Sequence, residues 1–230
     1  MEFCRAGKIV WEVACKTVII ISPVVPRRRE VNAFCQRDYR LGSILNEMSS
    51  ILYSEVLGKD WLALSENVRC AHSVGGQMNG VFRITYGTGW AAKKLARWSD
   101  LPPAADAANT RLKIFSEDAG ERWERQFNGE AFTTRQWRGK DGFLVERFGE
   151  WELHFKLRVK EGNLFYDQSC AKLCVGAFHF PMPRACAPHV FAKEIQDGAA
   201  RVLVTVMVTL PLVGLLISYE GYLNVKGDVA

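Results

Sequence analysis

The sequence lacks the short motifs that mark common catalytic and cofactor-binding sites. It contains no GxSxG, HExxH or GxGxxG, and the pair Gly87 and Gly89 is too weak a signal for a dinucleotide site. The four histidines show no metal-ligand spacing, so we interpret them as structural or surface residues. The sequence therefore predicts no metal site and no cofactor, and it identifies no catalytic residue.

The cysteines also form no recognisable pattern. Seven are present, an odd number with no CxxC pair, which argues against a disulfide framework and against a structural zinc site. Cys170, Cys174, His179 and Cys186 lie close together in the sequence, but their spacing matches no familiar metal motif. Buried thiols are common in protein cores, so core cysteines are the favoured interpretation.

Charge of one sign is not concentrated anywhere in the chain. The net charge of +5 comes from 30 Lys and Arg among 25 Asp and Glu, which excludes the clustered basic surface that nucleic acid requires. A helical face with Lys93, Lys94 and Arg97 is more typical of a solvated surface than of contact with a membrane surface. The apolar stretch 17–25 precedes its basic residues, the reverse of a signal peptide, so we expect a cytoplasmic protein.

The chain divides into three parts by pattern. Residues 1–47 show no helix-capping residues and no sustained hydrophobic periodicity, so we predict a poorly ordered extension. If translation begins at Met48, this extension is not part of the native protein. Residues 48–225 contain no evident linker or repeat and are predicted to form a single antiparallel β-rich domain. Residues 226–230 are a tail.

Within the domain, a helical pattern gives way to strands. Helical periodicity over 49–64 is weakened at Gly58, which favours two short pieces, and a second helix is expected over 90–98. After Pro103, short runs of period two alternate with turn residues, as in an antiparallel meander. The step Asn128-Gly129 is a strong hairpin signal because both residues tolerate positive φ.

The longest apolar run, residues 202–223, raises the question of a membrane span. Its alternation places Val202, Val204 and Val206 on one face and threonines on the other, which is typical of strands. Pro211 and Gly214 interrupt it. We therefore predict two consecutive core strands joined at LPLVG, with the threonine-bearing side toward any ligand.

These patterns together predict an α+β, mainly β fold. We expect a strongly curved or partly closed antiparallel sheet of about 8–10 strands, with one or two short N-terminal helices. A sheet that curls this far encloses a cavity lined by alternate residues.

Four segments resemble a bacterial family known as domain of unknown function 4166: GERWERQFNGEAFTTRQW, FLVERFGEWELHF, FPMPRACAPHVFAKE and TLPLVGLLISYEGYL. The resemblance covers about residues 51–223. It implies no established activity, because the family has none. Members resemble domains found alone or joined to oxidoreductases of the saccharopine dehydrogenase type, so the resemblance implies an accessory role beside a separate oxidoreductase.

Candidate site residues come from strand alternation. Glu121, Trp123, Arg125 and Phe127 share one face, which fits either a ligand cavity or an ion pair beside a core tryptophan. Glu146 is adjacent to Arg147 in sequence and therefore faces the opposite side of the strand. Two alternatives stay open for Glu146 at this point. It is paired with Arg125 or Arg135, which would lower its pKa, or it is unpaired in an apolar cavity, where its pKa would be raised and it could act as an acid or base.

Three hypotheses of function follow. The first is a non-catalytic binding domain for a hydrophobic or lipid-like small molecule, with six aromatic candidates for the lining: Trp90, Trp98, Trp123, Phe127, Trp137 and Tyr219. The second is an enzyme or an enzyme accessory module, in which five residues converge on one polar site: Glu121, Arg125, Glu146, Arg147 and Tyr219. The third is a structural protein-interaction domain.

Overall fold

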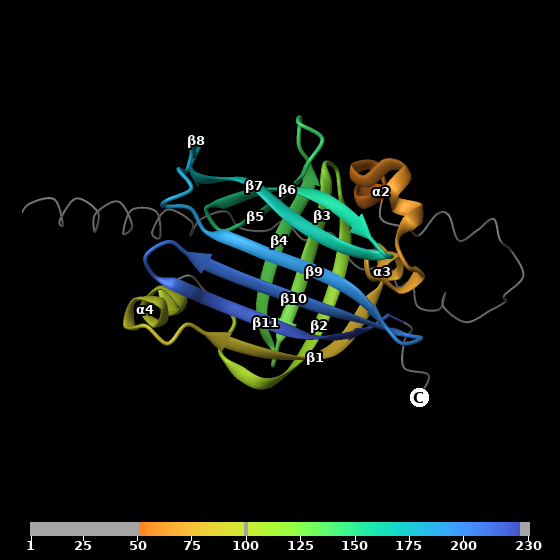
Figure 1. Ribbon diagram of the computed structural model, residues 1–230, viewed down its shortest axis with the longest axis horizontal. Helices are drawn as coiled ribbons and strands as arrows, with labels where there is room; N and C mark the ends of the chain where they lie inside the picture. Colours follow the sequence, from red (N-terminus) through yellow and green to blue (C-terminus); the bar gives the residue numbers. More distant parts are fainter. Residues whose placement is uncertain (1–50, 99–100, 226–230) are drawn as a thin grey trace, which may run out of the picture. The chain divides into compact units, whose positions relative to one another are not determined.

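A closed antiparallel barrel dominates the computed structural model, which describes residues 51–98 and 101–225. Within this part of the chain one sheet has the order β6-β5-β4-β3-β2-β1-β11-β10-β9-β7-β8, and a further pairing of β6 with β7 closes it (Figure 1). Ten strands thus form the barrel, and β8 pairs with β7 without being one of the barrel strands. The strands are β1 Gln77–Tyr86, β2 Ala105–Glu117, β3 Gly120–Phe127, β4 Glu130–Arg138, β5 Leu144–Phe148, β6 Trp151–Lys160, β7 Asn163–Val175, β8 Phe178–Pro181, β9 His189–Asp197, β10 Arg201–Leu210 and β11 Gly214–Asn224.

The expected curved antiparallel sheet is therefore confirmed in its class, but it closes completely. The sequence did not predict complete closure. Alternation along a strand shows which residues face inward, but it does not show which strands pair with each other. The predictions for residues 1–47 and 226–230 lie outside the described residues, and those described belong to one compact unit.

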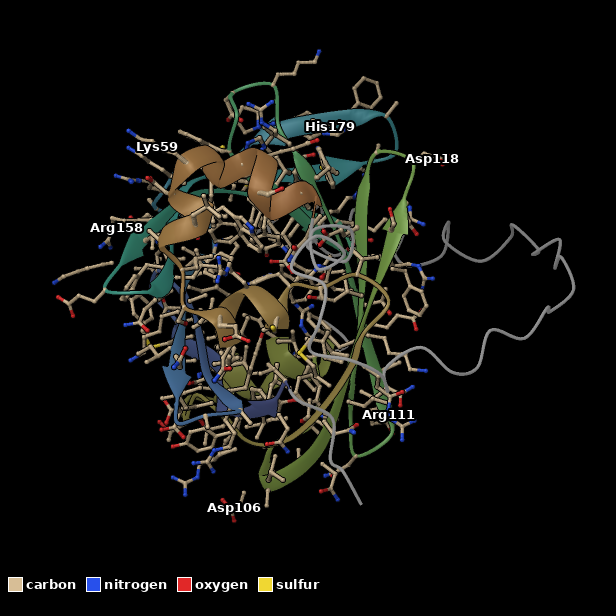
Figure 2. All side chains as sticks on the ribbon, turned by 90° about the vertical axis from the view of Figure 1, so that its right-hand side faces the viewer. Lys59, Asp106, Arg111, Asp118, Arg158 and His179 are labelled. Atoms are coloured by element: carbon tan, nitrogen blue, oxygen red, sulfur yellow. The ribbon has the colours of Figure 1, made fainter. Side chains whose placement is uncertain are left out.

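Short helices cover one end of the barrel. The first helical pattern breaks at Gly58 as predicted, giving α2, Ile51–Leu57, and the 3-10 helix η1, Gly58–Ala63. The sequence did not indicate the next helix, α3, Glu66–Ala71, because six residues are too few to show a period. In Figure 2, the helical segment that carries Lys59 lies in front of the strands.

The fourth helix lies on the side of the barrel. It is α4, Trp90–Trp98, as predicted from the sequence, and it contacts β11 and β1. Figure 1 shows α4 beside these strands, away from α2 and α3.

The inner faces of the strands and of the covering helices form the core. Among its largest fully buried side chains are Tyr53 of α2, Val68 of α3, Phe127 of β3 and Phe155 of β6. Charged side chains such as Arg111, Asp118 and Arg158 are exposed and lie at the periphery in Figure 2. Alternation along most strands thus separates a largely aromatic and aliphatic interior from a charged exterior.

Two turns show the predicted chemistry. Asn128 and Gly129 join β3 to β4 with φ values of 51° and 92°, which is the left-handed backbone that the hairpin requires. The apolar run 202–223 forms β10 and β11, joined by Pro211, Leu212 and Val213. Among the described residues no helix has the length and apolar character needed to cross a membrane.

Pairing of β1 with β11 depends on a close approach at Gly221. A Cβ atom at this position would overlap the carbonyl oxygen of Val81 and the ring of Phe82. We predict that Gly221→Ala lowers the free energy of unfolding by about 1–3 kcal/mol, the usual cost of overpacking, as measured by urea denaturation. Gly89→Ala is the matched control, because a Cβ there meets no atom and should leave the stability unchanged. Equal stability of the two variants would contradict the prediction.

Candidate functional site

A cavity of about 80 Å³ lies inside the barrel. Its wall comes from strands on all sides together with Ala71 at the end of α3. The polar and charged lining residues are Thr110, Arg125, Gln136, Glu146, Tyr166, Lys193, Glu194 and Tyr219. The hydrophobic lining residues are Phe82, Leu112, Trp123, Phe127, Phe155, Val190, Ala192, Val204, Val206 and Leu223. The site therefore combines an apolar wall with a small number of polar groups, as small-molecule sites commonly do.

Arg125 of β3 carries the most buried positive charge in this wall. Its Nη1 donates to Thr134 Oγ1 at 2.9 Å, and this is the hydrogen bond that the guanidinium makes within the described residues. Its Nη2 lies 3.6 Å from Glu146 Oε1, which is an ion pair but is too long for a hydrogen bond. Because a guanidinium has five N–H donors, Arg125 retains hydrogen-bonding capacity at the cavity.

The aromatic neighbours of Arg125 fix its position. Its guanidinium carbon lies 5.0 Å from the centre of the Trp123 ring and 6.0 Å from that of Phe132. Cation–π attraction of this kind is strengthened where water is excluded. Burial acts to lower the pKa of Arg125, but the charge of Glu146 together with the nearby tyrosines raises that pKa on balance, so Arg125 stays charged.

A chain of hydrogen bonds joins the covering helices to the barrel. Glu194 of β9 is at its centre, with Oε2 2.8 Å from His72 Nε2 and Oε1 accepting from the Tyr166 hydroxyl at 2.8 Å. The Tyr166 hydroxyl lies 3.2 Å from that of Tyr53, which donates to Gln136 Oε1 at 2.8 Å. Buried polar groups are costly unless paired, so these bonds make the helices part of the barrel interior.

Burial and neighbouring charges shift the pKa values of three tyrosines and of Glu194 at this site. Burial, followed by the charge of Glu194, raises the pKa of Tyr53 and of Tyr166 well above its ordinary value. Burial raises the pKa of Tyr219 to about 12. For Glu194, burial acts to raise the pKa, but the charge and hydrogen bond of His72 and the bond from Tyr166 lower it on balance.

The apolar part of the wall contains a cluster of three rings. Phe82, Phe127 and Tyr219 come from β1, β3 and β11, and their centroids lie 5.8–6.2 Å apart. Tilted and edge-on contacts at this spacing are favourable for aromatic rings. These rings fill much of the interior, which explains the small volume of the cavity.

The structure brings half of the sequence-derived candidates together. Five line the cavity: Trp123, Arg125, Phe127, Glu146 and Tyr219. Glu146 lies beside Arg125, whereas Arg135 pairs with Glu117 on the outside.

Glu121 lies inside but is not a lining residue. It is buried and accepts a hydrogen bond from Trp123 Nε1 at 3.0 Å. Its carboxylate therefore orients the tryptophan, whose ring faces the cavity.

The other candidates lie elsewhere. Trp90 is 79% exposed at the start of α4 and is not among the residues that line the cavity. Trp137 and Arg147 follow the inward-facing Gln136 and Glu146 directly, so alternation turns them outward. Arg147 Nε donates to the carbonyl of Gly149. The side chain of Trp98 lies outside the described residues.

The expected ligand-facing side of the apolar run was wrong. Val204 and Val206 line the cavity, whereas Thr205 points outward and its Oγ1 donates to Glu220 Oε2 at 2.9 Å. The threonine side was expected to face a ligand because it offers polar groups. In the closed barrel, the unbroken apolar face is the one that packs inside.

Sequence reasoning missed the histidine–glutamate–tyrosine chain. His72 was interpreted as structural or surface, and it is fully buried against Glu194. Tyr166 alternates with the buried Leu164, a period-two signal that indicates an inward tyrosine. No pattern in the sequence indicates that Glu194, which is 28 residues from Tyr166 and 122 from His72, meets both groups.

The comparisons with known proteins give a family. The model described as "Domain of unknown function (DUF4166)" matches residues 64–223, and the chain belongs to this family. The resemblance seen in the sequence is thereby confirmed, although the bacterial source stays a prediction. No curated protein matches the sequence.

One solved structure shows a distant likeness. It is described as a secretary abundant heat soluble (SAHS) protein from Ramazzottius varieornatus, at 12% identity and a TM-score of 0.33. The match covers 65% of this chain and 92% of that chain. At this TM-score the likeness supports no conclusion about function.

We predict that Glu194 makes the stability of the barrel depend on acidity. Its folded pKa is lowered, so the unfolded carboxyl, with a pKa of about 4.3, binds a proton first as the pH falls. The stabilisation is therefore complete above about pH 4.3 and is lost as the pH drops through the lower folded pKa. Urea denaturation between pH 7 and pH 2 should show a steeper acid loss for the wild type than for Glu194→Gln.

The same variant should be less stable at neutral pH. Replacing the carboxylate leaves His72 without its charged partner, which costs about 3–5 kcal/mol for a buried pair. Glu124→Gln removes a carboxylate that pairs with Arg122 on the outside of β3 and should cost less than about 1 kcal/mol. If the stability of Glu194→Gln falls with decreasing pH as steeply as that of the wild type, Glu194 does not cause the acid dependence.

Proposed function

We propose that the barrel is a non-catalytic binding domain for a small hydrophobic molecule with a polar end group that accepts hydrogen bonds. The observation that carries this proposal is Arg125, a buried charged group at the cavity that makes one hydrogen bond within the described part of the chain, to Thr134. Each further N–H of the Arg125 guanidinium that donates to a ligand contributes more binding free energy in this apolar setting than it would in water.

The apolar part of the ligand contacts the hydrophobic residues of the wall. Phe82 and Phe127 belong to the ring cluster, and Val204 and Val206 continue the apolar surface on β10. An alkyl group gains about 0.8 kcal/mol for each methylene that it buries against such a wall. This gain and the polar contact at Arg125 together orient the ligand in the cavity.

The size of the cavity limits the ligand. By the volume that a water molecule needs, a space of about 80 Å³ holds on the order of five waters or a ligand of similar size. A long lipid chain does not fit unless the ring cluster moves. We therefore expect short, compact hydrophobic molecules to bind better than long-chain lipids.

Binding is favoured over catalysis by the titration behaviour of the site. General acid–base catalysis needs groups whose pKa lies near the working pH. Tyr53, Tyr166 and Tyr219 have raised pKa values and Glu194 has a lowered one, so each stays in one protonation state near neutrality. Of the five residues in the enzyme hypothesis, Arg147 lies on the outer face and Glu121 supports Trp123.

The remaining hypotheses concern partners. An accessory role beside a separate oxidoreductase and a role as an interaction domain both stay predictions. Co-purification of the full chain with such an enzyme is their direct test.

A series of straight-chain carboxylic acids and the alcohols of equal length tests the proposed function by isothermal titration calorimetry. We predict saturable binding with a maximum at short to medium chain length, and stronger binding of each acid than of its alcohol. Arg125→Met should weaken acid binding about 10- to 100-fold, the worth of a charged hydrogen bond, and should leave alcohol binding nearly unchanged.

Matched variants separate this effect from a loss of folding. Arg122→Met removes an arginine from the same strand, but Arg122 faces outward and bonds to Glu117, so binding should not change. Arg125→Lys retains the charge without the planar fork and should keep part of the preference for acids. If no acid or alcohol binds to the folded wild type, or if Arg125→Met binds acids normally, the proposal is wrong.

A further inference from the structure

A second cluster of functional groups lies on the outer face of β6, β7 and β8. Glu152 comes from β6, Cys174 from β7 and His179 from β8, and one ligand atom of each lies within 4.8 Å of the other two. Figure 1 shows β8 beside β7 at the rim of the sheet, and Figure 2 labels His179 there. None of these residues lines the barrel cavity.

The distances between the three ligand atoms match a tetrahedral metal site. Cys174 Sγ lies 3.3 Å from His179 Nδ1, which lies 3.4 Å from Glu152 Oε2, and Sγ and Oε2 are 3.9 Å apart. A tetrahedral zinc ion with normal bonds to sulfur, nitrogen and oxygen separates its ligand atoms by about 3.3–3.6 Å. All three edges therefore agree with this geometry within a few tenths of an ångström.

We propose that Glu152, Cys174 and His179 bind a divalent transition-metal ion of the zinc type, with water as the fourth ligand. Thiolate, imidazole and carboxylate are the three side-chain donors that zinc takes in proteins. A thiolate disfavours magnesium and calcium, which prefer oxygen ligands. The combination of donors thus selects a borderline-soft ion.

The surrounding residues hold Glu152 in the orientation that the metal requires. Its Oε1 lies 2.8 Å from both Lys172 Nζ and His154 Nε2, so Oε2 is the oxygen directed at Cys174 and His179. His154 is fixed in turn, because its Nδ1 lies 3.2 Å from Asp141 Oδ2. Metal-binding carboxylates are commonly supported by hydrogen bonds of this kind.

The charges and the exposure of the cluster also suit an ion. Glu152 and a Cys174 thiolate balance the two charges of the metal, and Lys172 already neutralises part of the carboxylate. Cys174 and Glu152 are buried, whereas the His179 side chain is 44% exposed. An ion can therefore enter from the solvent side, and the fourth position is open to water.

The spacing of these residues in the sequence predicted no metal site. Cys174 and His179 are five residues apart across the short β7–β8 hairpin, and Glu152 comes from another strand. The alternative to a metal is that the three groups bond only to one another. A metal titration of the full chain separates these two possibilities.

Cobalt(II) is the probe, because a thiolate bound to it gives an ultraviolet charge-transfer band and tetrahedral cobalt gives visible bands. We expect one cobalt per chain to give both signals, zinc to displace it, and magnesium to have no effect. Cys174→Ser should abolish the charge-transfer band. Cys170→Ser is the matched control, because this exposed cysteine of the same strand lies outside the cluster and its loss should leave the band intact.

His179→Gln tests the site without endangering the fold, because this side chain is largely exposed. The affinity of this variant for cobalt should fall at least about 10- to 100-fold, which is the loss seen when a residue that hydrogen-bonds to a metal ligand is replaced. His189→Gln, which removes an exposed histidine that bonds to the carbonyl of Arg184, should bind normally. No charge-transfer band in the wild type, or a band that survives both Cys174→Ser and His179→Gln, would overturn the proposal. Binding of acids in the barrel is independent of this outcome.

Discussion

The pairing of β6 with β7 is the constraint on which the rest of this structure depends. Without it the other strands would form an open sheet, and with it they enclose an interior. Closure removes the free edges of the barrel strands and leaves the short β8 as an edge on the outside. It also fixes the direction of every barrel side chain, because residues on an antiparallel strand alternate between inside and outside.

Polar groups are costly in a closed interior unless they are paired, and this cost explains much of the arrangement of the site, although His72 Nδ1 has no hydrogen-bond partner among the described residues. Glu194 is buried among apolar strands and is stabilised by His72 from the covering helices and by Tyr166 from the neighbouring strand. Arg125 is stabilised by Glu146 and by the face of Trp123, and its hydrogen bond to Thr134 is the one that it makes to the residues the structure describes, so its guanidinium retains donors for a ligand. Both oxygens of the Glu194 carboxylate bond to protein groups, whereas the guanidinium of Arg125 retains donors that can bond to a ligand. This difference is why the proposed binding function centres on Arg125.

Much of the fold could be predicted because it depends on local patterns. The hairpin at Asn128-Gly129, the break at Gly58 and the two strands of the apolar run each follow from neighbouring residues. The site was predictable only on single strands, as with Trp123, Arg125 and Phe127, which share the inner face of β3. The pairing of His72 with Glu194 was not predictable, because these residues are 122 positions apart and meet only in the folded barrel. Trp137, an aromatic candidate for the lining, directly follows the inward Gln136 and is not among the residues that line the cavity.

The two proposed sites share strand β7, and one extra residue separates them. The register of β6 and β7 shifts between His154, opposite Cys170, and Phe155, opposite Gln168, so Ser169 is the additional residue of a β-bulge. Before the bulge the even-numbered residue Tyr166 faces the cavity, and after it the odd-numbered Ala171 takes the inner side. The even-numbered Lys172 and Cys174 consequently point outward beside Glu152. A regular strand would have turned Cys174 into the barrel, so the bulge is what allows one strand to serve a binding cavity on one face and a metal cluster on the other.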